Sequence, residues 1–271
     1  MPPKTEDDQE VGGGVMKLND GNTMPMLGYG LGTVMHKASR DQKNQAIVEM
    51  TRLAIEYGCR HLDCAELYNN EELGDAVRAS SVPRSEIFVV TKLCGTEKRD
   101  VKAEFQGSLN RLGLDYVDLY LVHGPYMADN TEDLQLDQLA YPTFSVNSIE
   151  YHPYLQRGTL VEFLKKHNIA VSAYSILTAL TELPPGRVDE LYTKLANKYN
   201  VTEADVALRW CMDQQIAAIT TTRSEERLKA YCKNIPTFSL TKDEIDNISR
   251  AGQFTHYRKF LTDRFAWDDR R

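Results

Sequence analysis

Four side chains that can hold or move a proton lie at or just beyond the ends of three apolar segments of this 271-residue chain. Asp63, Lys92 and His123 each end a separate apolar segment, and Tyr68 follows five residues after Asp63. Taken singly, each has an ordinary explanation: a solvated or salt-bridged rim residue for Asp or Lys, packing for Tyr, and a hydrogen-bonding role for His. Three consecutive apolar segments that end in Asp, Lys and His are harder to explain this way, because charge beside apolar strands is costly unless it is paired.

Apolar segments and helical patterns alternate along the chain, which predicts a parallel sheet with right-handed crossovers. In such proteins the βα loops gather at the carboxyl edge of the sheet, where ligands bind. The pattern does not separate a closed barrel from an open sheet, although the lack of a GxGxxG after a strand disfavours a Rossmann fold. We predict strands at 26–31, 61–65, 87–93, 117–123, 144–151, 170–176 and 217–221, and helices at 46–57, 71–79, 101–112, 160–166, 188–198 and 204–214.

Local signals support these elements. Asp20-Gly21 between two short apolar stretches predicts a hairpin. Thr202 with Asp205, and Thr241 with Glu244, have the spacing of helix capping boxes. Segment 117–123 is mostly apolar, as expected for a strand buried on both faces.

The composition is that of an ordinary soluble globular protein, with 42% hydrophobic and 26% charged residues. A net charge of −7 argues against nucleic acid or an anionic membrane as a partner, and no apolar run reaches the length of a membrane span. Residues 1–14 are expected to form a disordered tail without a signal peptide, and 15–271 a single domain. Five cysteines without CxxC spacing indicate free thiols, a cytoplasmic location and no metal site.

Six segments of the chain form a recognisable set of motifs. They are 18–34 (LNDGNTMPMLGYGLGTV), 60–74 (RHLDCAELYNNEELG), 90–93 (VTKL), 118–125 (DLYLVHGP), 150–155 (EYHPYL) and 173–175 (AYS). In this order they resemble the aldo-keto reductases, and the resemblance runs from about residue 16 to the C-terminus. The fold that it implies is a TIM-type (β/α)8 barrel. The tail segment 256–265 (HYRKFLTDRF) is most similar to a fungal carbonyl reductase branch.

The resemblance implies NADPH-dependent reduction of an aldehyde or ketone, with a role for each of the four side chains. Tyr68 is the expected proton donor, and its pKa is expected to be lowered by Lys92, which an ion pair to Asp63 holds in place. His123 is expected to hydrogen-bond the substrate oxygen. No metal is needed. The expected partner is a small carbonyl compound, and the expected state a monomer or a weak homo-oligomer.

The resemblance also implies a set of cofactor contacts. The aromatic ring of Tyr174 matches the one that stacks on the nicotinamide. In segment 219–227 the family's usual Pro-Lys-Ser is replaced by Thr220-Thr221-Thr222, but Arg227 keeps the family arginine and Arg223 adds a charge, which favours NADPH over NADH. The expected contacts are Gly32, Thr33, Asp63, Ser148, Tyr174, Ser175, Leu177, Thr221, Thr222, Arg223 and Arg227.

One part of the family pattern is shortened. Only some twenty residues separate His123 from the next apolar segment at Phe144, whereas a βαβ unit needs about thirty. The family's Ser-Asn pair for the nicotinamide carboxamide does not occur there, and its next carboxamide ligand, a Gln, is Ser148. We therefore expect a barrel that lacks one strand and helix, with seven recognisable strands. A catalytically impaired NADPH-binding or regulatory protein is the main alternative, and an isomerase or lyase on the same fold is a weaker one.

Overall fold

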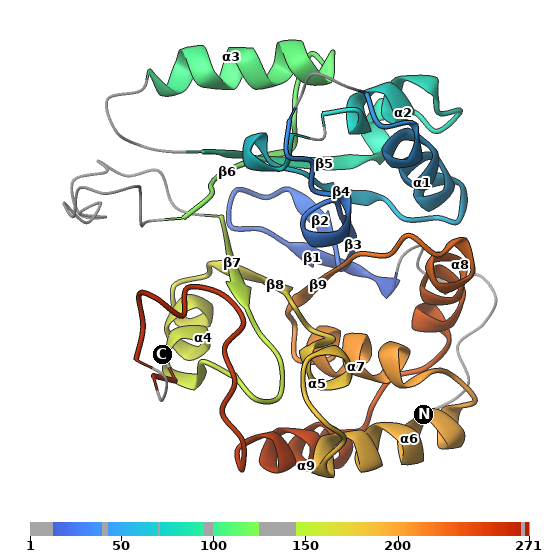
Figure 1. The fold of residues 1–271 in the computed structure, drawn as a ribbon, viewed down its shortest axis with the longest axis vertical. Helices are drawn as coiled ribbons and strands as arrows, with labels where there is room; N and C mark the ends of the chain where they lie inside the picture. The colour runs from blue at the N-terminus through green and yellow to red at the C-terminus, as the bar shows by residue number, and fades with distance from the viewer. Residues whose placement is uncertain are drawn as a thin grey trace. The chain divides into compact units, whose positions relative to one another are not determined.

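The chain folds into two compact units, each of which is described by itself. The larger unit contains residues 1–27, 143–220 and 230–271, and the smaller unit contains residues 28–142 and 221–229. The computed structural model, drawn in Figure 1, describes residues 13–39, 43–69, 71–94, 100–124, 145–266 and 269–270.

Strands and helices alternate in the smaller unit, as the sequence predicts. The strands pair in parallel in the order β3, β4, β5, β6. They are β3 (Leu27–Gly30), β4 (His61–Asp63), β5 (Phe88–Leu93) and β6 (Leu119–Val122). The helices are α1 (Gln45–Glu56), α2 (Leu73–Ala79) and α3 (Val101–Leu112), with the 3-10 turns η3 (Thr33–Met35), η4 (Glu66–Tyr68) and η5 (Arg84–Glu86).

Side chains at the helix ends explain where these helices begin and end. The Asn44 side chain accepts a hydrogen bond from Ala46 N at the start of α1, and the Asp100 side chain does the same for α3. Helix α3 ends at Gly113, which adopts a left-handed φ of 64°. Gly74 lets α2 pack directly on α3, since a Cβ there would lie 1.8 Å from the Leu112 carbonyl oxygen. The three helices lie side by side (Figure 1).

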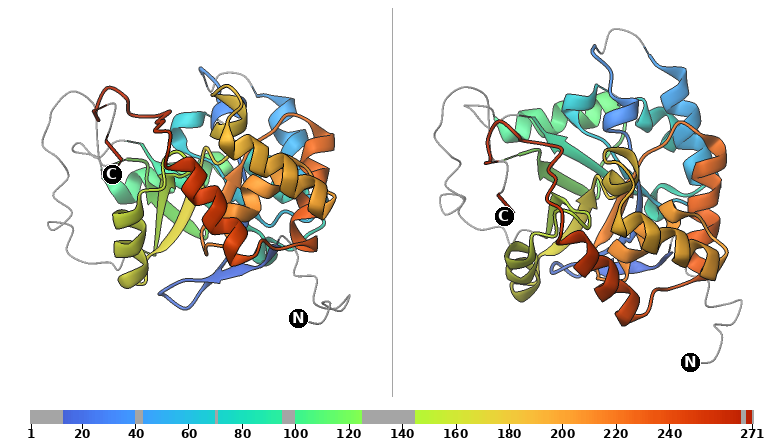
Figure 2. Two further views of the ribbon diagram at one scale, coloured as in Figure 1. Left: turned by 90° about the horizontal axis from the view of Figure 1, so that it is seen from below. Right: turned by 60° about the horizontal axis from the view of Figure 1, so that its bottom comes forward.

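The larger unit contains an antiparallel hairpin of β1 and β2, drawn in blue in Figure 2, and a parallel sheet in the order β9, β8, β7. Helix α6 packs on α7 and α9, and α4 on β8. The strands are β1 (Val15–Lys17), β2 (Thr23–Pro25), β7 (Val146–Glu150), β8 (Ala170–Tyr174) and β9 (Ala217–Thr220). The helices are α4 (Gly158–Lys166), α5 (Thr178–Thr181), α6 (Arg187–Tyr199), α7 (Glu203–Met212), η6 (Ile235–Thr237) and α9 (Lys242–Gly252), while α8 (Glu225–Asn234) begins in the smaller unit.

The strand and helix predictions are confirmed for the described residues, with boundaries that differ by a few residues. Both expected capping boxes form: Thr202 and Asp205 bond reciprocally at the start of α7, and Thr241 and Glu244 do so at the start of α9. Helix α5, only four residues long, was not predicted, because a single turn leaves no periodicity to detect.

The expected disordered tail is wrong for its last two residues. Residues 1–12 lie outside the described part, but Gly14 is buried and its carbonyl accepts a hydrogen bond from Met26 N at 2.9 Å. Gly13 packs so closely that a Cβ would lie 2.7 Å from Ile235 and from Met212. The glycines permit a close backbone approach rather than disorder. The larger unit therefore begins no later than Gly13.

The expectation that 117–123 forms a fully buried strand is also wrong. All six residues of β5 are buried, whereas no residue of β6 is, and Val122 is 42% exposed. Within the described residues β6 pairs with β5 alone, so fewer side chains cover it. An apolar sequence permits burial, but only neighbouring elements provide it.

The five cysteines, all within the described part of the chain, form no disulfide. Across the described residues, no cluster of His, Cys, Asp or Glu has an arrangement that could hold a metal ion. None of the helices in that part of the chain combines the length and the apolar character needed to cross a bilayer.

Candidate active site

Lys92 and Asp63 form a buried ion pair at the carboxyl ends of neighbouring strands in the smaller unit. Lys92 Nζ donates to Asp63 Oδ1 at 2.5 Å and to the Cys64 carbonyl oxygen at 2.9 Å. Both side chains are at least nine-tenths buried. Burial is the largest single effect and lowers the Lys92 pKa, but Asp63, together with Tyr68 and Cys64, outweighs it, so the pKa of Lys92 is raised. Lys92 is therefore a fixed positive charge at neutral pH.

The Tyr68 phenol lies next to this charge. Lys92 Nζ is 4.9 Å from the centroid of the Tyr68 ring. Tyr68 ends the turn η4, and its carbonyl oxygen accepts a hydrogen bond from Lys37 N at 3.0 Å. Gly32 packs against the ring: a Cβ there would lie 3.4 Å from Cζ and 3.6 Å from the hydroxyl. A Cβ at these distances would make ordinary van der Waals contact, so the phenol itself does not require a glycine at position 32.

The expected lowering of the Tyr68 pKa is not what the protein without ligands shows. Burial dominates and raises the pKa of Tyr68, while the Lys92 charge acts in the expected direction and lowers it. The error has a physical cause, because sequence reasoning counted the neighbouring cation and left out desolvation. Tyr68 is consequently a phenol that keeps its proton at neutral pH.

His123 follows β6 by one residue and also packs against the Tyr68 ring. The two rings meet edge to face, with centroids 5.2 Å apart and an interplanar angle of 88°. Burial, aided by the Lys92 charge, lowers the His123 pKa to about 4, so the imidazole is neutral at pH 7. Its Nδ1 is buried without a hydrogen-bond partner among the described residues. A neutral imidazole with free hydrogen-bonding capacity suits a polar ligand atom.

The predicted phosphate-binding loop also belongs to the smaller unit, where it precedes and opens α8. Arg223 and Arg227 are exposed, and neither guanidinium forms an ion pair within the described part of the chain. Thr222 Oγ1 accepts from Ser224 N, whereas Thr221 Oγ1 is buried and has no partner among the described residues. Uncompensated guanidiniums beside a helix N-terminus form a suitable site for a phosphate group.

Two tyrosines that the sequence did not single out hold this loop. The buried Tyr29, on β3, donates its hydroxyl to the Thr222 carbonyl oxygen at 2.8 Å. Tyr57, after α1, donates to Glu225 at 2.5 Å in the first turn of α8. A lone tyrosine in an apolar segment looks like core packing, so no sequence signal marks this role.

The remaining predicted cofactor residues belong to the larger unit, except Thr33, which is exposed on η3 of the smaller unit. Tyr174 ends β8 and is half-buried. Ser175 has a left-handed φ of 59°, and its carbonyl oxygen accepts from Thr178 N and Oγ1, so the chain turns sharply into α5 with Leu177 at its start. Ser148 is half-buried on β7.

The expected shortening after His123 falls on residues 125–144, which lie outside the described part of the chain. That prediction stays untested. The structure describes seven strands in parallel pairs, four in one unit and three in the other, which agrees with the number expected from the sequence.

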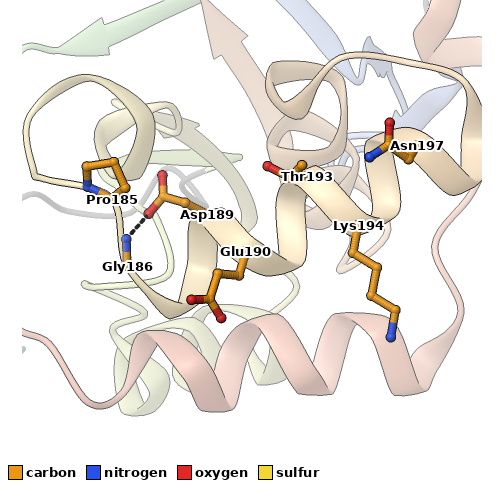
Figure 3. A pocket seen from close by; sticks show the side chains of 7 residues that line it. All are labelled: Pro185, Gly186, Asp189, Glu190, Thr193, Lys194 and Asn197. Carbon is orange, nitrogen blue, oxygen red and sulfur yellow. Dashed lines mark hydrogen bonds between the residues drawn. The ribbon is translucent and has the colours of Figure 1, made fainter.

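The described surface also has a shallow hollow on the larger unit, shown in Figure 3. It is formed by the start and one face of α6, from Pro185 to Asn197. The Asp189 carboxylate on its wall accepts a hydrogen bond from Gly186 N and thus caps the helix (Figure 3). None of the candidate site residues lines this hollow, and its acidic side chains do not suit the phosphates of a dinucleotide.

Comparison with known sequences gives a consistent family. The model described as "Aldo/keto reductase family" matches residues 26–139 and 126–253. An NAD/NADP-dependent indole-3-acetaldehyde reductase of Schizosaccharomyces pombe is 31% identical, over 89% of this chain and 96% of that protein. A methylglyoxal reductase of Salmonella typhimurium is 32% identical, over 88% of this chain and 94% of that protein.

Solved structures agree with the sequence relatives. An aldo/keto reductase from Brucella melitensis superposes with a TM-score of 0.75 at 30% identity, covering 88% of this chain and 99% of the other. A Bombyx mori aldo-keto reductase, solved in complex with NADP, gives 0.76 at 29% identity, covering 89% and 93%. The chain therefore has the TIM-type (β/α)8 fold class of these neighbours, and seven strands of that fold lie within the described residues.

Proposed function

Because the chain belongs to the aldo/keto reductase family, we propose that it is an NADPH-dependent enzyme that reduces an aldehyde or a ketone to an alcohol. The observation that carries the assignment of catalytic residues is the buried Lys92–Asp63 ion pair beside the Tyr68 phenol, with the His123 ring edge to face with the Tyr68 ring. This arrangement gives a proton donor, a charge that stabilises its conjugate base, and a neutral hydrogen-bonding group for the carbonyl oxygen.

In this proposal Tyr68 is the general acid. Its raised pKa keeps the proton on the phenol until the carbonyl oxygen becomes an alkoxide, which is a much stronger base than a phenolate. Lys92 stabilises the phenolate that remains, and Asp63 keeps the ammonium charged and fixed beside it. The bound nicotinamide of NADPH supplies the hydride.

His123 orients the substrate. Since burial keeps the imidazole neutral, it can donate one N–H to the carbonyl oxygen without placing a second full cation beside Lys92. A hydrogen bond aimed at the oxygen stabilises negative charge as it develops in the transition state.

The cofactor contacts are part of the same proposal. In the smaller unit, Arg223 and Arg227 hold the adenosine 2′-phosphate, aided by Thr221 and Thr222, while Gly32, Thr33 and Asp63 contact the nicotinamide half. The buried, unpartnered Thr221 Oγ1 supports this assignment, because a ligand would satisfy it. In the larger unit, Tyr174 stacks on the nicotinamide, Ser148 stands at the carboxamide position, and Ser175 and Leu177 contact the pyrophosphate.

We also propose that the barrel lacks one strand and helix. Because a shortened barrel would lack ligands for the nicotinamide, a catalytically impaired NADPH-binding protein remains the alternative function. The alignment with the Schizosaccharomyces pombe reductase runs over 277 positions, more than the 271 residues of this chain, although it covers only 89% of them. Many aligned positions therefore have no residue in this chain. The exposure of β6, directly before the segment expected to be short, points the same way.

The test is NADPH titration by fluorescence quenching, followed by turnover with an aldehyde panel that includes indole-3-acetaldehyde and methylglyoxal. The proposed enzyme binds NADPH more tightly than NADH and oxidises it only when an aldehyde is present. Binding without any turnover would favour the impaired, regulatory alternative, and absence of binding would contradict both.

A cytoplasmic location and a monomer or weak homo-oligomer are proposed as well. The lack of a disulfide among the five described cysteines supports a reducing compartment. Fractionation of cells and light scattering of the purified protein test these two statements.

A further inference from the structure

Glu150, at the end of β7, is a buried carboxylate with three hydrogen-bond donors. It is 1% exposed. Oε1 accepts from Lys259 N at 2.6 Å and Oε2 from Phe260 N at 3.1 Å, while His152 Nε2 lies 3.3 Å from Oε1. A carboxylate only accepts, so the imidazole donates from Nε2. The three donors offset the cost of burying the charge, and the Glu150 pKa is lowered although burial alone would raise it.

These bonds tie the C-terminal segment 257–260 to the sheet across more than a hundred residues of sequence. Two further contacts hold the same segment. Tyr257 N donates to the Tyr154 carbonyl oxygen at 3.4 Å, and Lys259 Nζ pairs with Glu182 at 2.5 Å, just after α5. The exposed ion pair contributes little by itself, but the backbone bonds to the buried Glu150 fix the path of the chain.

The fixed segment places Phe260 against Tyr174. Glu150 and Tyr174 are register partners on the parallel strands β7 and β8, so the carboxylate and the tyrosine stand next to each other at the sheet edge. The Phe260 ring meets the Tyr174 ring nearly edge to face, with centroids 5.7 Å apart and an interplanar angle of 78°. This is a favourable aromatic geometry that restrains the orientation of the Tyr174 ring.

We propose that Glu150 is a positioning residue for cofactor binding: by clasping Lys259 and Phe260 it sets the Phe260 ring, which fixes the plane of the Tyr174 ring on which the nicotinamide stacks. The inference rests on the proposed function, in which Tyr174 is that platform. It assigns the C-terminal segment a role in aligning the cofactor. This restraint on the Tyr174 ring matters more in this chain than in one with the full family pattern. Ser148 replaces the family's Gln and the Ser-Asn pair does not occur, so the alignment of the nicotinamide depends more on stacking.

The experiment compares the binding of NADPH with the binding of a fragment that lacks the nicotinamide. Dissociation constants are measured for NADPH and for 2′,5′-ADP, which carries the adenosine phosphate but no nicotinamide, together with the single-turnover rate of aldehyde reduction. The variants are Glu150→Gln, Phe260→Ala and Phe260→Tyr, and Phe163→Ala serves as a control, since Phe163 is a 54% exposed aromatic residue on α4 of the same unit.

We expect Glu150→Gln and Phe260→Ala to weaken NADPH binding several-fold and to slow hydride transfer by roughly ten- to a hundredfold, the range that misalignment can produce. Binding of 2′,5′-ADP should stay unchanged. Phe260→Tyr keeps the ring and should restore both values, and Phe163→Ala should match the parent protein. Phe260 is only partly buried, so its variants test the inference even if Glu150→Gln fails to fold.

Two results would overturn the inference. Equal weakening of NADPH and 2′,5′-ADP would show a general structural role for Glu150, and unchanged hydride transfer in Phe260→Ala would show that Phe260 does not align the platform. Failure of the parent protein to bind NADPH would instead overturn the proposed function itself.

Discussion

The two neighbouring strands that lead to Lys92 and His123 are both apolar in sequence but differ in burial. Strand β5 is buried at all six positions, whereas β6 is buried at none. Lys92 is therefore embedded in packed surroundings that fix the ion pair to Asp63, while His123 follows a strand with one described neighbour. The difference teaches that the surroundings of Lys92, which include the proposed proton donor, are closely packed, whereas the strand that leads to His123 is covered less.

The largest effect is expected in the closely packed surroundings of Lys92. Tyr68→Phe removes the proposed proton donor and should lower turnover by about 10²–10⁴-fold, the usual contribution of a general acid. NADPH affinity should hardly change, because the substitution keeps the ring. Steady-state kinetics and NADPH titration check this, with the parent protein as control. Substantial activity in Tyr68→Phe would remove this residue from the mechanism.

A stability comparison tests the two strands directly. Lys92→Ala leaves the buried Asp63 carboxylate without its cation, which should cost about 3–5 kcal/mol in the free energy of unfolding. His123→Ala, after the exposed β6, should cost clearly less. Urea unfolding monitored by circular dichroism measures both. Similar losses would mean that the two positions are equally well packed.

Adding the strand and helix that the family pattern contains should reduce the difference in burial between β5 and β6. Inserting a family-type strand and helix between Tyr126 and Asp129 should cover β6, raise the melting temperature and raise the hydride-transfer rate by up to about a hundredfold, as alignment improves. The gain in NADPH affinity should be smaller, because Arg223 and Arg227 are already present. Thermal melting, NADPH titration and single-turnover reduction test this; comparable values for both proteins would show that seven strands build a competent site.

The proposed contact to the adenosine 2′-phosphate of the cofactor predicts an effect on binding that is similar to the previous one or smaller. Arg227→Ala removes a charge-assisted contact to the 2′-phosphate, worth about 1.5–3 kcal/mol, and should weaken NADPH far more than NADH. Lys233→Ala, later in α8, is a matched control that should leave both affinities near those of the parent protein. Should NADPH and NADH weaken equally, Arg227 does not contact that phosphate.

The smallest effect concerns the pH dependence of stability. The folded-state pKa of His123 is about 4, below its ordinary 6.5, so the unfolded chain takes up this proton first. The destabilisation begins as pH falls below 6.5 and is complete below 4; at pH 5 it amounts to at most about 2 kcal/mol. Between pH 7.5 and pH 5 the free energy of unfolding of the parent protein should therefore fall relative to that of His123→Gln, which lacks this titrating group. A constant difference would mean that His123 is not desolvated.

Much of the fold was predictable because it is encoded locally. The spacing of Thr202 with Asp205 predicts a capping box, and its bonds form, whereas the caps Asn44 and Asp100 have no partner residue at a fixed spacing that would mark them. The candidate residues Asp63, Lys92 and His123 could be found because charged residues interrupt apolar strands at one edge of a parallel sheet. Tyr29 and Glu150 as supporting residues could not be found, since their partners lie 193 and about 110 positions away in the sequence.

The sequence by itself determined the order of strands and helices, two capping boxes, and the four candidate side chains, because each depends on periodicity or on residues a few positions apart. The tertiary structure alone decided that Tyr68 keeps its proton, that β6 is only partly buried, and that Gly13 and Gly14 pack in the larger unit. These properties depend on how much solvent and which distant groups surround a residue, and burial is a property of the assembled fold.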